Sequence, residues 1–188
     1  LETPPAFRYD GVYTYRKKGG FLMEKIEQAP TFSDGVRACV PTILGYLGIG
    51  FAMGVVGKGI GLSILQIFLM SLIVYAGSAQ FIICGMLAIQ APISSIIVTV
   101  FFINLRHFLM SLSVAPYFQK ATLWENIGIG SLLTDESYGV LTTYLRQNRV
   151  VSVSWMNGLN LLAYTVWVVA TVLGGVLGRF ISHPESLG

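Results

Sequence analysis

The sequence predicts an all-α integral membrane protein, a polytopic helical bundle with about five crossings, some of them broken helices. Two observations carry this prediction. First, 54% of the 188 residues are hydrophobic and only 11% are charged, whereas about 25% of residues are charged in ordinary soluble domains. Second, the long stretch from Gly59 to Leu105 contains no Asp, Glu, Lys or Arg. A chain with so little polar surface belongs in a lipid bilayer.

Five apolar segments follow a polar beginning. Residues 1–37 are expected to form a cytoplasmic N-terminal extension, and Met23 is an alternative start that would leave residues 1–22 outside the native protein. A transmembrane domain is expected at residues 38–188. About 20 residues of helix cover the hydrocarbon core, which is about 30 Å thick. On that basis the expected crossings are about residues 38–57, 61–88, 92–113, 121–144 and 151–178. We also expect further spans beyond residue 188.

The distribution of cations predicts the orientation of the bundle. Half of the twelve Lys and Arg residues precede the first apolar segment, and positive residues are enriched on the cytoplasmic side of membrane proteins. Five crossings from a cytoplasmic N-terminus would place Lys58 and Lys120 outside and Arg146 inside. The net charge of +3 is small and spread along the chain, so we expect membrane lipid and not nucleic acid as a partner.

Glycines in the first and fifth segments favour close helix packing. Gly50 and Gly54 are four residues apart, as are Gly174 and Gly178, a spacing that lets two membrane helices approach each other. The stretch GYLGIGFAMG, which also contains Tyr46, has a second interpretation. Its four glycines each weaken a helix by about 1 kcal/mol, so the stretch could be unwound and offer backbone amides to a ligand.

Residues 74–81, VYAGSAQF, bring polar groups into the second segment. Tyr75, Ser78 and Gln80 supply hydroxyls and an amide, while Gly77 and its small neighbours Ala76 and Ala79 make the helix narrow at this point. Two interpretations stay open. The polar side chains could form hydrogen bonds between helices, or the helix could break here and turn freed amides and carbonyls toward a cavity. Irregular backbone at membrane depth is tolerated only where it is buried or wetted.

Arg106 and His107 interrupt the apolar stretch FFINLRHFLMSL of the third segment, close to Asn104. An ionised side chain at mid-membrane costs on the order of 3 kcal/mol, so Arg106 needs a partner unless it snorkels to the interface. The fourth segment supplies two neighbouring carboxylates, Asp135 and Glu136. We expect these acids to meet Arg106, either as a structural ion pair or as a proton and substrate relay.

The sequence has no motif that indicates catalysis. Cys39 and Cys84 lie in apolar stretches without metal-ligand spacing to a His, and neither a nucleophile elbow nor a nucleotide loop is present. We therefore predict no metal, no cofactor, no catalytic residue and no enzymatic activity. Two alternatives are a structural membrane subunit whose partner forms the pathway and a membrane-embedded enzyme that uses His107 as a general base.

Four motifs, taken in order, resemble the successive signatures of the AzlC family: ILGYLGIGFAMG, LMSLIVYAGSAQF, NLRHFLMSLSVAP and LTDESYG. The likeness extends from about Phe32 to the end of the chain. It implies the large subunit of a two-component permease in the cytoplasmic (inner) membrane of a bacterium. It also implies a small membrane subunit of the AzlD type as a partner and proton-coupled export of branched-chain or other apolar amino acids.

A zwitterionic amino acid would need a cation or free amides for its carboxylate, an anion for its ammonium group and an apolar wall for its side chain. We expect the wall near Phe101, Phe102 and Phe108. The expected proton relay or ion pair comprises Arg106, Asp135 and Glu136. The expected substrate-binding residues are Tyr46, Gly77, Ser78, Gln80, Asn104, Arg106 and His107.

Overall fold

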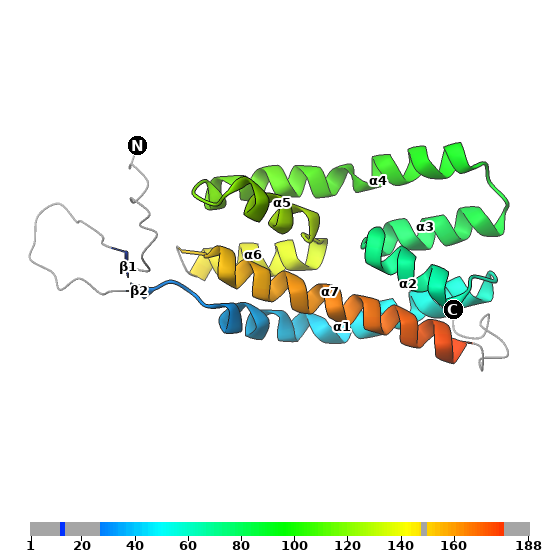
Figure 1. The fold of residues 1–188 in the computed structure, drawn as a ribbon, viewed down its shortest axis with the longest axis horizontal. Helices are drawn as coiled ribbons and strands as arrows, with labels where there is room; N and C mark the ends of the chain where they lie inside the picture. Colours follow the sequence, from blue (N-terminus) through cyan, green and yellow to red (C-terminus); the bar gives the residue numbers. More distant parts are fainter. Residues whose placement is uncertain (1–11, 14–26, 148–149, 179–188) are drawn as a thin grey trace, which may run out of the picture.

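The structure, a computed structural model, describes residues 12–13, 27–147 and 150–178 (Figure 1). Within them, the two-residue strands β1 (Val12–Tyr13) and β2 (Glu27–Gln28) form a short antiparallel pair, and seven α-helices follow. The predicted all-α class is confirmed. Much of the predicted N-terminal extension, residues 1–11 and 14–26, lies outside the described residues.

Three helices in the described part of the chain are long and apolar enough to cross a membrane. They are α1 (Phe32–Gly59), α4 (Ile93–Val114), which continues into the 3-10 turn η1 (Ala115–Phe118), and α7 (Val153–Gly178). Their 22 to 28 residues make helices of about 33–42 Å, which is enough to cross the hydrocarbon core. Helices α1 and α7 pair along their length, and α4 runs along the opposite side of the bundle (Figure 1).

Four shorter helices form two hairpins. Each helix has 9 to 13 residues, a length of about 14–20 Å, and therefore reaches only about halfway through the hydrocarbon core. The first hairpin joins α2 (Ile64–Ile73) to α3 (Gly77–Ala88), and the second joins α5 (Leu123–Ser131) to α6 (Asp135–Gln147).

The first hairpin enters and leaves at the end of the bundle where α1 and α7 stop. Helix α2 starts there, with Ile67 close to Gly175. It ends near the middle of α7, where Tyr164 Oη donates a hydrogen bond to Leu72 O at 2.8 Å. Helix α3 starts at that level and runs back (Figure 1). The break between the two helices, residues 74–76, falls in the VYAGSAQF stretch, as one of the two interpretations expected. The other interpretation also holds, because Gln80 forms hydrogen bonds to Ser71 of α2 and Trp167 of α7.

The second hairpin enters from the opposite end. Helix α5 packs on the first half of α7, where Asn160 Nδ2 donates to Ile129 O at 3.3 Å. Helix α6 then returns, so that the ring of Tyr144 lies on that of Trp155 with centroids 4.4 Å apart. Trp155 belongs to the start of α7 and touches Gly35 at the start of α1. The chain therefore leaves this hairpin on the side where it entered (Figure 1).

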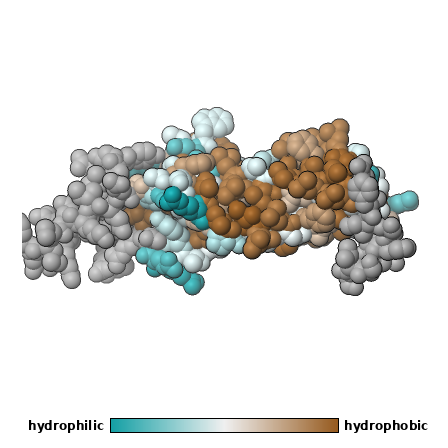
Figure 2. Space-filling model, turned by 90° about the horizontal axis from the view of Figure 1, so that it is seen from below, coloured by the Kyte–Doolittle hydropathy of each residue, from teal (hydrophilic) through white to brown (hydrophobic). Residues whose placement is uncertain are grey.

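Two of the five predicted apolar segments do not run straight through the bundle. All five segments are helical, and three helices in the described residues are long enough to cross a membrane, whereas residues 61–88 and 121–144 are each divided into two half-length helices that turn back. Hydropathy depends on composition and does not distinguish a helix that continues from one that reverses at a break. In this arrangement η1, which Lys120 follows, lies at the end of the bundle where α1 starts, whereas Lys58 is in the last turn of α1 at the opposite end (Figure 1). Five crossings would have placed both lysines on one side. Polar residues gather toward the end where α1 starts in Figure 2.

The two hairpins and the long helices that follow them form two repeats of inverted topology. Each repeat is a capped half-helix, a three-residue break, a second half-helix and a crossing helix: α2 to α4 and α5 to α7. The capping boxes of Ser63 with Gln66 and of Thr122 with Glu125 open the two repeats. Because the repeats enter from opposite ends, their breaks meet near the middle of the bundle (Figure 1).

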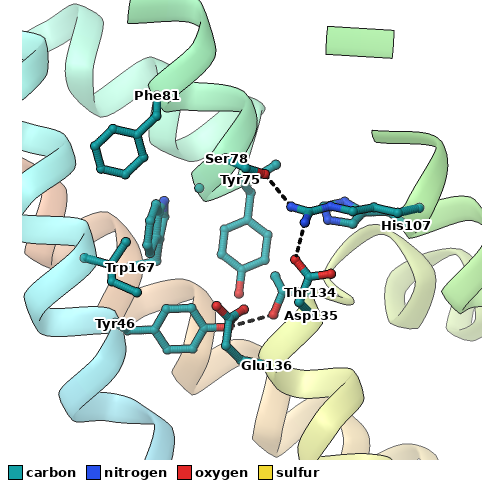
Figure 3. Close-up of a pocket in the computed structure, with 13 residues that line it drawn as sticks. Tyr46, Tyr75, Ser78, Phe81, His107, Thr134, Asp135, Glu136 and Trp167 are labelled. Atoms are coloured by element: carbon teal, nitrogen blue, oxygen red, sulfur yellow. Dashed lines mark hydrogen bonds and ion pairs between the residues drawn. The ribbon is translucent and has the colours of Figure 1, made fainter. Parts of the chain in front are cut away.

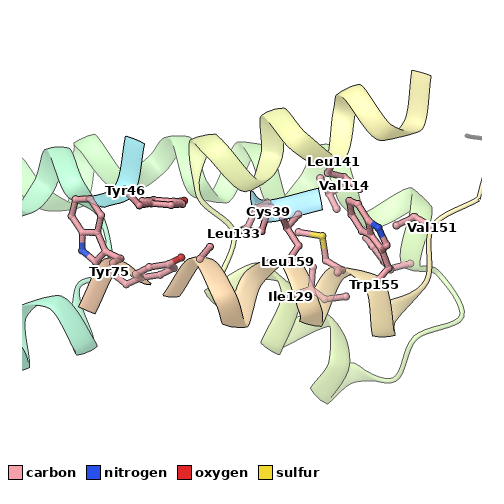
Figure 4. Close-up of a cluster of buried hydrophobic side chains, with 14 of the residues drawn as sticks. Cys39, Tyr46, Tyr75, Val114, Ile129, Leu133, Leu141, Val151, Trp155 and Leu159 are labelled. Carbon is pink, nitrogen blue, oxygen red and sulfur yellow. The ribbon is translucent and has the colours of Figure 1, made fainter. Parts of the chain in front are cut away.

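Buried apolar side chains attach the second hairpin to α1 and α7 (Figure 4). Trp155 and Leu159 of α7, Leu141 of α6 and Cys39 of α1 have no exposed surface or almost none. Lipid tails are as apolar as these side chains, so close packing and not transfer from water holds the helices together. Cys84 is equally buried, in agreement with the interpretation of both cysteines as small core residues.

Small residues let α1 and α7 approach closely. A Cβ at Gly54 would lie 2.0 Å from Thr171 O, and one at Gly174 would lie 2.0 Å from Phe51 O. No side chain fits at either position, so the packing interpretation of the glycine spacing is confirmed. The alternative of an unwound stretch at residues 45–54 is wrong, because α1 continues through it.

The substitution Gly54→Ala should lower the free energy of unfolding by about 1–3 kcal/mol, since the added methyl group forces α1 and α7 apart. The matched control is Gly48→Ala on the same helix, where a Cβ would have no neighbour within 4 Å. That control should keep or slightly raise stability, because alanine favours the helix. Thermal unfolding in detergent measures both. Equal melting temperatures for the two variants would contradict the packing of α1 on α7.

Single cysteines at Lys58 and Gln119 should react with a membrane-impermeant maleimide from opposite sides of the membrane. Three crossings separate these positions onto different sides, whereas five crossings would place both on the same side. The native Cys39 and Cys84 are fully buried, and the unsubstituted protein measures their background labelling. Labelling of both positions from one side of sealed vesicles would refute the hairpin topology.

Candidate substrate-binding site

A cavity of about 290 Å³ lies where the two hairpin breaks meet (Figure 3). Ligand pockets start at about 300 Å³, so this volume suits a small ligand. Seven of the residues singled out in the sequence line it: Tyr46, Gly77, Ser78, Arg106, His107, Asp135 and Glu136. Six further lining residues were not among the expected substrate-binding residues: Ile49, Tyr75, Ala76, Phe81, Thr134 and Trp167.

The first break presents backbone amides to the cavity. Tyr75 has a φ of 40°, in the left-handed region that residues other than glycine rarely adopt. Its backbone turns the chain so that α3 starts at Gly77 after Ala76, which provides no capping side chain. The first amides of α3 have no partner within the helix. They and the positive end of the helix dipole make this edge of the cavity suitable for an anion.

Tyr75 also brings an unused hydroxyl group to the cavity. Its side chain is 6% exposed and packs edge-on against the ring of Tyr164, with centroids 4.7 Å apart. Among the described residues Tyr75 Oη has no hydrogen-bond partner. In Figure 3 this hydroxyl points toward the carboxylate of Glu136 across the cavity. A buried hydroxyl without a partner costs about 1–3 kcal/mol, and a ligand in the cavity could satisfy it.

The second break is capped and carries the acids. Thr134 accepts a hydrogen bond from Ser137 N at 3.3 Å, while Thr134 N donates to Ser137 Oγ at 2.8 Å, so the start of α6 is closed by its own side chains. Tyr46 of α1 shares a hydrogen bond with Thr134 Oγ1 at 2.6 Å and donates to Glu136 Oε2 at 3.2 Å. These bonds fix the Glu136 carboxylate against one wall of the cavity.

Arg106 joins the two breaks. Its Nη1 lies 2.8 Å from Asp135 Oδ2 at the start of α6, and its Nη2 donates to Ser78 Oγ at the start of α3 (Figure 3). Of the two acids expected to meet Arg106, Asp135 is therefore the one that pairs with it. The side chains of Arg106 and Asp135 remain 40% and 46% exposed, so the protein does not seal the pair off from the cavity. The pair holds a cation beside both breaks.

Three other expectations differ from the structure. Gln80 is fully buried and does not line the cavity; it bonds to Ser71 and Trp167 instead. Asn104 lies on α4 outside the lining, and its Oδ1 has no hydrogen-bond partner in the described residues. The apolar wall is not formed by Phe101, Phe102 and Phe108, which are 60–64% exposed on the outside of α4. Ile49, Phe81 and Trp167 form it.

The residues missed by the sequence analysis left different signals. Tyr75 was noted for its hydroxyl group in VYAGSAQF but was not assigned to the site, and Thr134 lies inside LTDESYG. The roles of both depend on where each helix breaks. Trp167 lies in the middle of an apolar segment, whereas membrane Trp residues concentrate at the interfaces. The central position of Trp167 in its segment was therefore the feature by which the sequence could have identified it. No sequence feature distinguishes Ile49 and Phe81, because apolar residues fill both of their helices.

Comparison with known proteins gives a consistent family. A family model described as AzlC protein matches residues 41–181. Inner membrane protein YgaZ of Escherichia coli K12 is 33% identical over 155 residues, which cover 79% of this chain and 61% of that protein. An uncharacterized membrane protein of Archaeoglobus fulgidus is 30% identical over 157 residues, covering 83% of this chain and 67% of that protein.

A more distant relative carries a functional name. Branched-chain amino acid transport protein AzlC of Bacillus subtilis 168 is 25% identical over 154 residues, which cover 80% of this chain and 59% of that protein. The chain thus spans about three fifths to two thirds of the length of these relatives. No solved structure matches this chain.

Proposed function

The chain belongs to the AzlC family, and from that premise we propose that it exports branched-chain or other apolar amino acids across the cytoplasmic membrane. In this proposal it is the large subunit of a two-component permease and is a transporter without enzymatic activity. The name of the Bacillus subtilis relative supports the substrate class, and the name of YgaZ supports an inner-membrane location.

The observation that carries the proposal is the chemistry of the cavity at the two breaks. The uncapped amides at Gly77 and the guanidinium of Arg106 suit a carboxylate. The carboxylate of Glu136 keeps acceptor capacity beyond its bond to Tyr46 and suits an ammonium group. Phe81 and the other apolar lining residues suit a hydrocarbon side chain. One small cavity therefore offers the three kinds of group that a zwitterionic apolar amino acid needs.

The orientation follows from the charges at the two ends of the bundle. The start of α1, which contains Arg37, the end of α6, which contains Arg146, and η1, which Lys120 follows, lie at one end of the bundle (Figure 1). Lys58 is in the last turn of α1, at the other end. The excess of positive residues supports a cytoplasmic location for the first end and thus for the N-terminus.

The partner in this proposal is a small membrane subunit of the AzlD type. Helix α4 offers an outer face for lipid or for such a subunit, since Phe101, Phe102 and Phe108 point away from the bundle with 60–64% of their surface exposed. The family resemblance, and not this face, carries the identity of the partner.

Proteoliposomes loaded with labelled leucine test the proposal. The unsubstituted protein, with and without its partner subunit, should release leucine unchanged. Arg106→Lys should slow release about tenfold while the protein stays folded, because lysine keeps the charge and loses the forked geometry that reaches Ser78, Asp135 and a substrate carboxylate at once. Arg37→Lys is the control, because that side chain is 78% exposed at the bundle end.

Each outcome of this assay separates the candidates. Chemical conversion of leucine would indicate an enzyme, and equal flux from the partner subunit with and without this chain would indicate a structural subunit whose partner forms the pathway. Normal efflux by Arg106→Lys would remove Arg106 from the substrate site.

Proton coupling is expected to involve the acids at the start of α6. They face Arg106 and His107 of α4, Tyr46 of α1 and Tyr75 of the first break. Removal of the coupled carboxylate in Asp135→Asn or Glu136→Gln should flatten the dependence of leucine efflux on pH. Glu125→Gln is the control, because that carboxylate caps α5 away from the cavity and glutamine can keep the cap. An unchanged pH profile in both cavity variants would refute the relay.

A further inference from the structure

Trp167 is held in one orientation by a chain of buried hydrogen bonds that crosses three helices. Trp167 Nε1 on α7 donates to Gln80 Oε1 on α3 at 2.8 Å, and Gln80 Nε2 donates to Ser71 Oγ on α2 at 3.0 Å. The three side chains are at most 3% exposed. An indole N–H only donates, so the carbonyl of Gln80 must face it and the amide cannot flip. The chain of bonds therefore has one direction and fixes the ring.

Two contacts determine where the rest of the indole lies. Its benzo edge is so close to α3 that a Cβ at Gly77 would be 2.9 Å from Cη2. The ring of Tyr46 meets the indole edge-on, with centroids 5.8 Å apart and an interplanar angle of 76°. The indole thus lies directly beside the first amides of α3, with its polar edge in the protein and its apolar surface toward the cavity (Figure 3).

This location matters for an amino acid bound as described above. A carboxylate at the amides of Gly77 brings the α-carbon of the substrate close to the benzo edge of Trp167. The substrate side chain must then share a cavity of about 290 Å³ with that ring. A hydrogen-bonded indole cannot turn away to admit a larger side chain, unlike a wall of flexible aliphatic residues.

We propose that Trp167 is the specificity-determining residue of this site, which sets the largest side chain that the cavity admits, and that Gln80 and Ser71 are its positioning residues. The inference rests on the proposed function, because it treats an amino acid as the substrate. In this proposal the buried amide of Gln80 orients Trp167 and does not contact the substrate.

The experiment compares efflux of alanine, valine, leucine and phenylalanine from proteoliposomes containing the full chain with its partner subunit. Trp167→Phe enlarges the cavity and should shift the phenylalanine-to-valine ratio of efflux rates upward, on the order of tenfold. Gly77→Ala adds a methyl group against the indole and should shift selectivity toward alanine. Gln80→Met releases the indole and should bring the four rates closer together.

Trp155→Phe is the matched control. Trp155 lies on the same helix and is fully buried, but it stacks on Tyr144 away from the cavity. This variant should keep the selectivity of the unsubstituted protein even if its stability falls. If Trp167→Phe does not give a monodisperse protein, Gly77→Ala and Gln80→Met decide the question, because they act on the ring from opposite edges.

The failures of the two proposals are distinguishable. If the unsubstituted protein moves none of the four amino acids, the proposed function is wrong and this inference falls with it. If the unsubstituted protein exports leucine and the variants at Trp167, Gly77 and Gln80 leave the ratios unchanged, the inference alone is wrong.

Discussion

A helix that breaks in the middle of a bilayer must hide its unpaired backbone groups inside the protein. Each unsatisfied amide or carbonyl costs several kcal/mol in hydrocarbon. This chain breaks twice, at residues 74–76 and 132–134, and the two breaks lie against each other between α1, α4 and α7 (Figure 1). The rest of the fold encloses the two breaks. Three long helices surround the two hairpins, and glycines bring α1 and α7 together so closely that no Cβ fits at Gly54 or Gly174.

The two inverted repeats satisfy their breaks in different ways. In the second repeat Thr134 and Ser137 cap the start of α6. In the first repeat Ala76 cannot cap the start of α3, so its amides remain available. Each break is also reached by a side chain from the crossing helix of the other repeat. Arg106 of α4 pairs with Asp135 at the start of α6, and Trp167 of α7 lies on Gly77 at the start of α3.

This divergence gives the cavity its polarity. The Arg106–Asp135 ion pair lies at one break, and the ring of Trp167 lies beside the free backbone amides at the other. A symmetric pair of breaks would present the same chemistry twice, whereas this pair presents complementary groups to the two ends of a zwitterion. Inverted repeats with binding groups at discontinuous helices are a general feature of secondary transporters, and they place the binding groups at equal depth from both sides of the membrane.

Several residues of the site could be identified from the sequence because they are charged, polar or small residues in otherwise apolar segments. Arg106, Asp135 and Glu136 are charges in segments that should contain none, and the small residues around Gly77 indicate a weak helix. The structure brings these residues together as expected. Gln80 was identified for the same reason, but its amide serves Trp167 and not the cavity. Trp167 could not be assigned from its neighbours, since its role comes from a contact with a helix about 90 residues earlier in the chain.

The sequence alone determined the membrane class, the helical segments, a candidate position for the first break and the identity of the charged residues in the apolar segments. These properties follow from local composition, since hydrophobicity, glycine content and the cost of an ion in lipid act on each segment separately. The tertiary structure decided which apolar segments run through the bundle and which turn back, the end of the bundle at which Lys120 lies and the residues that form the wall of the cavity. The physical reason is that a half-helix that returns and one that continues bury the same residues in the same lipid. Only packing against α1, α4 and α7 selects between them.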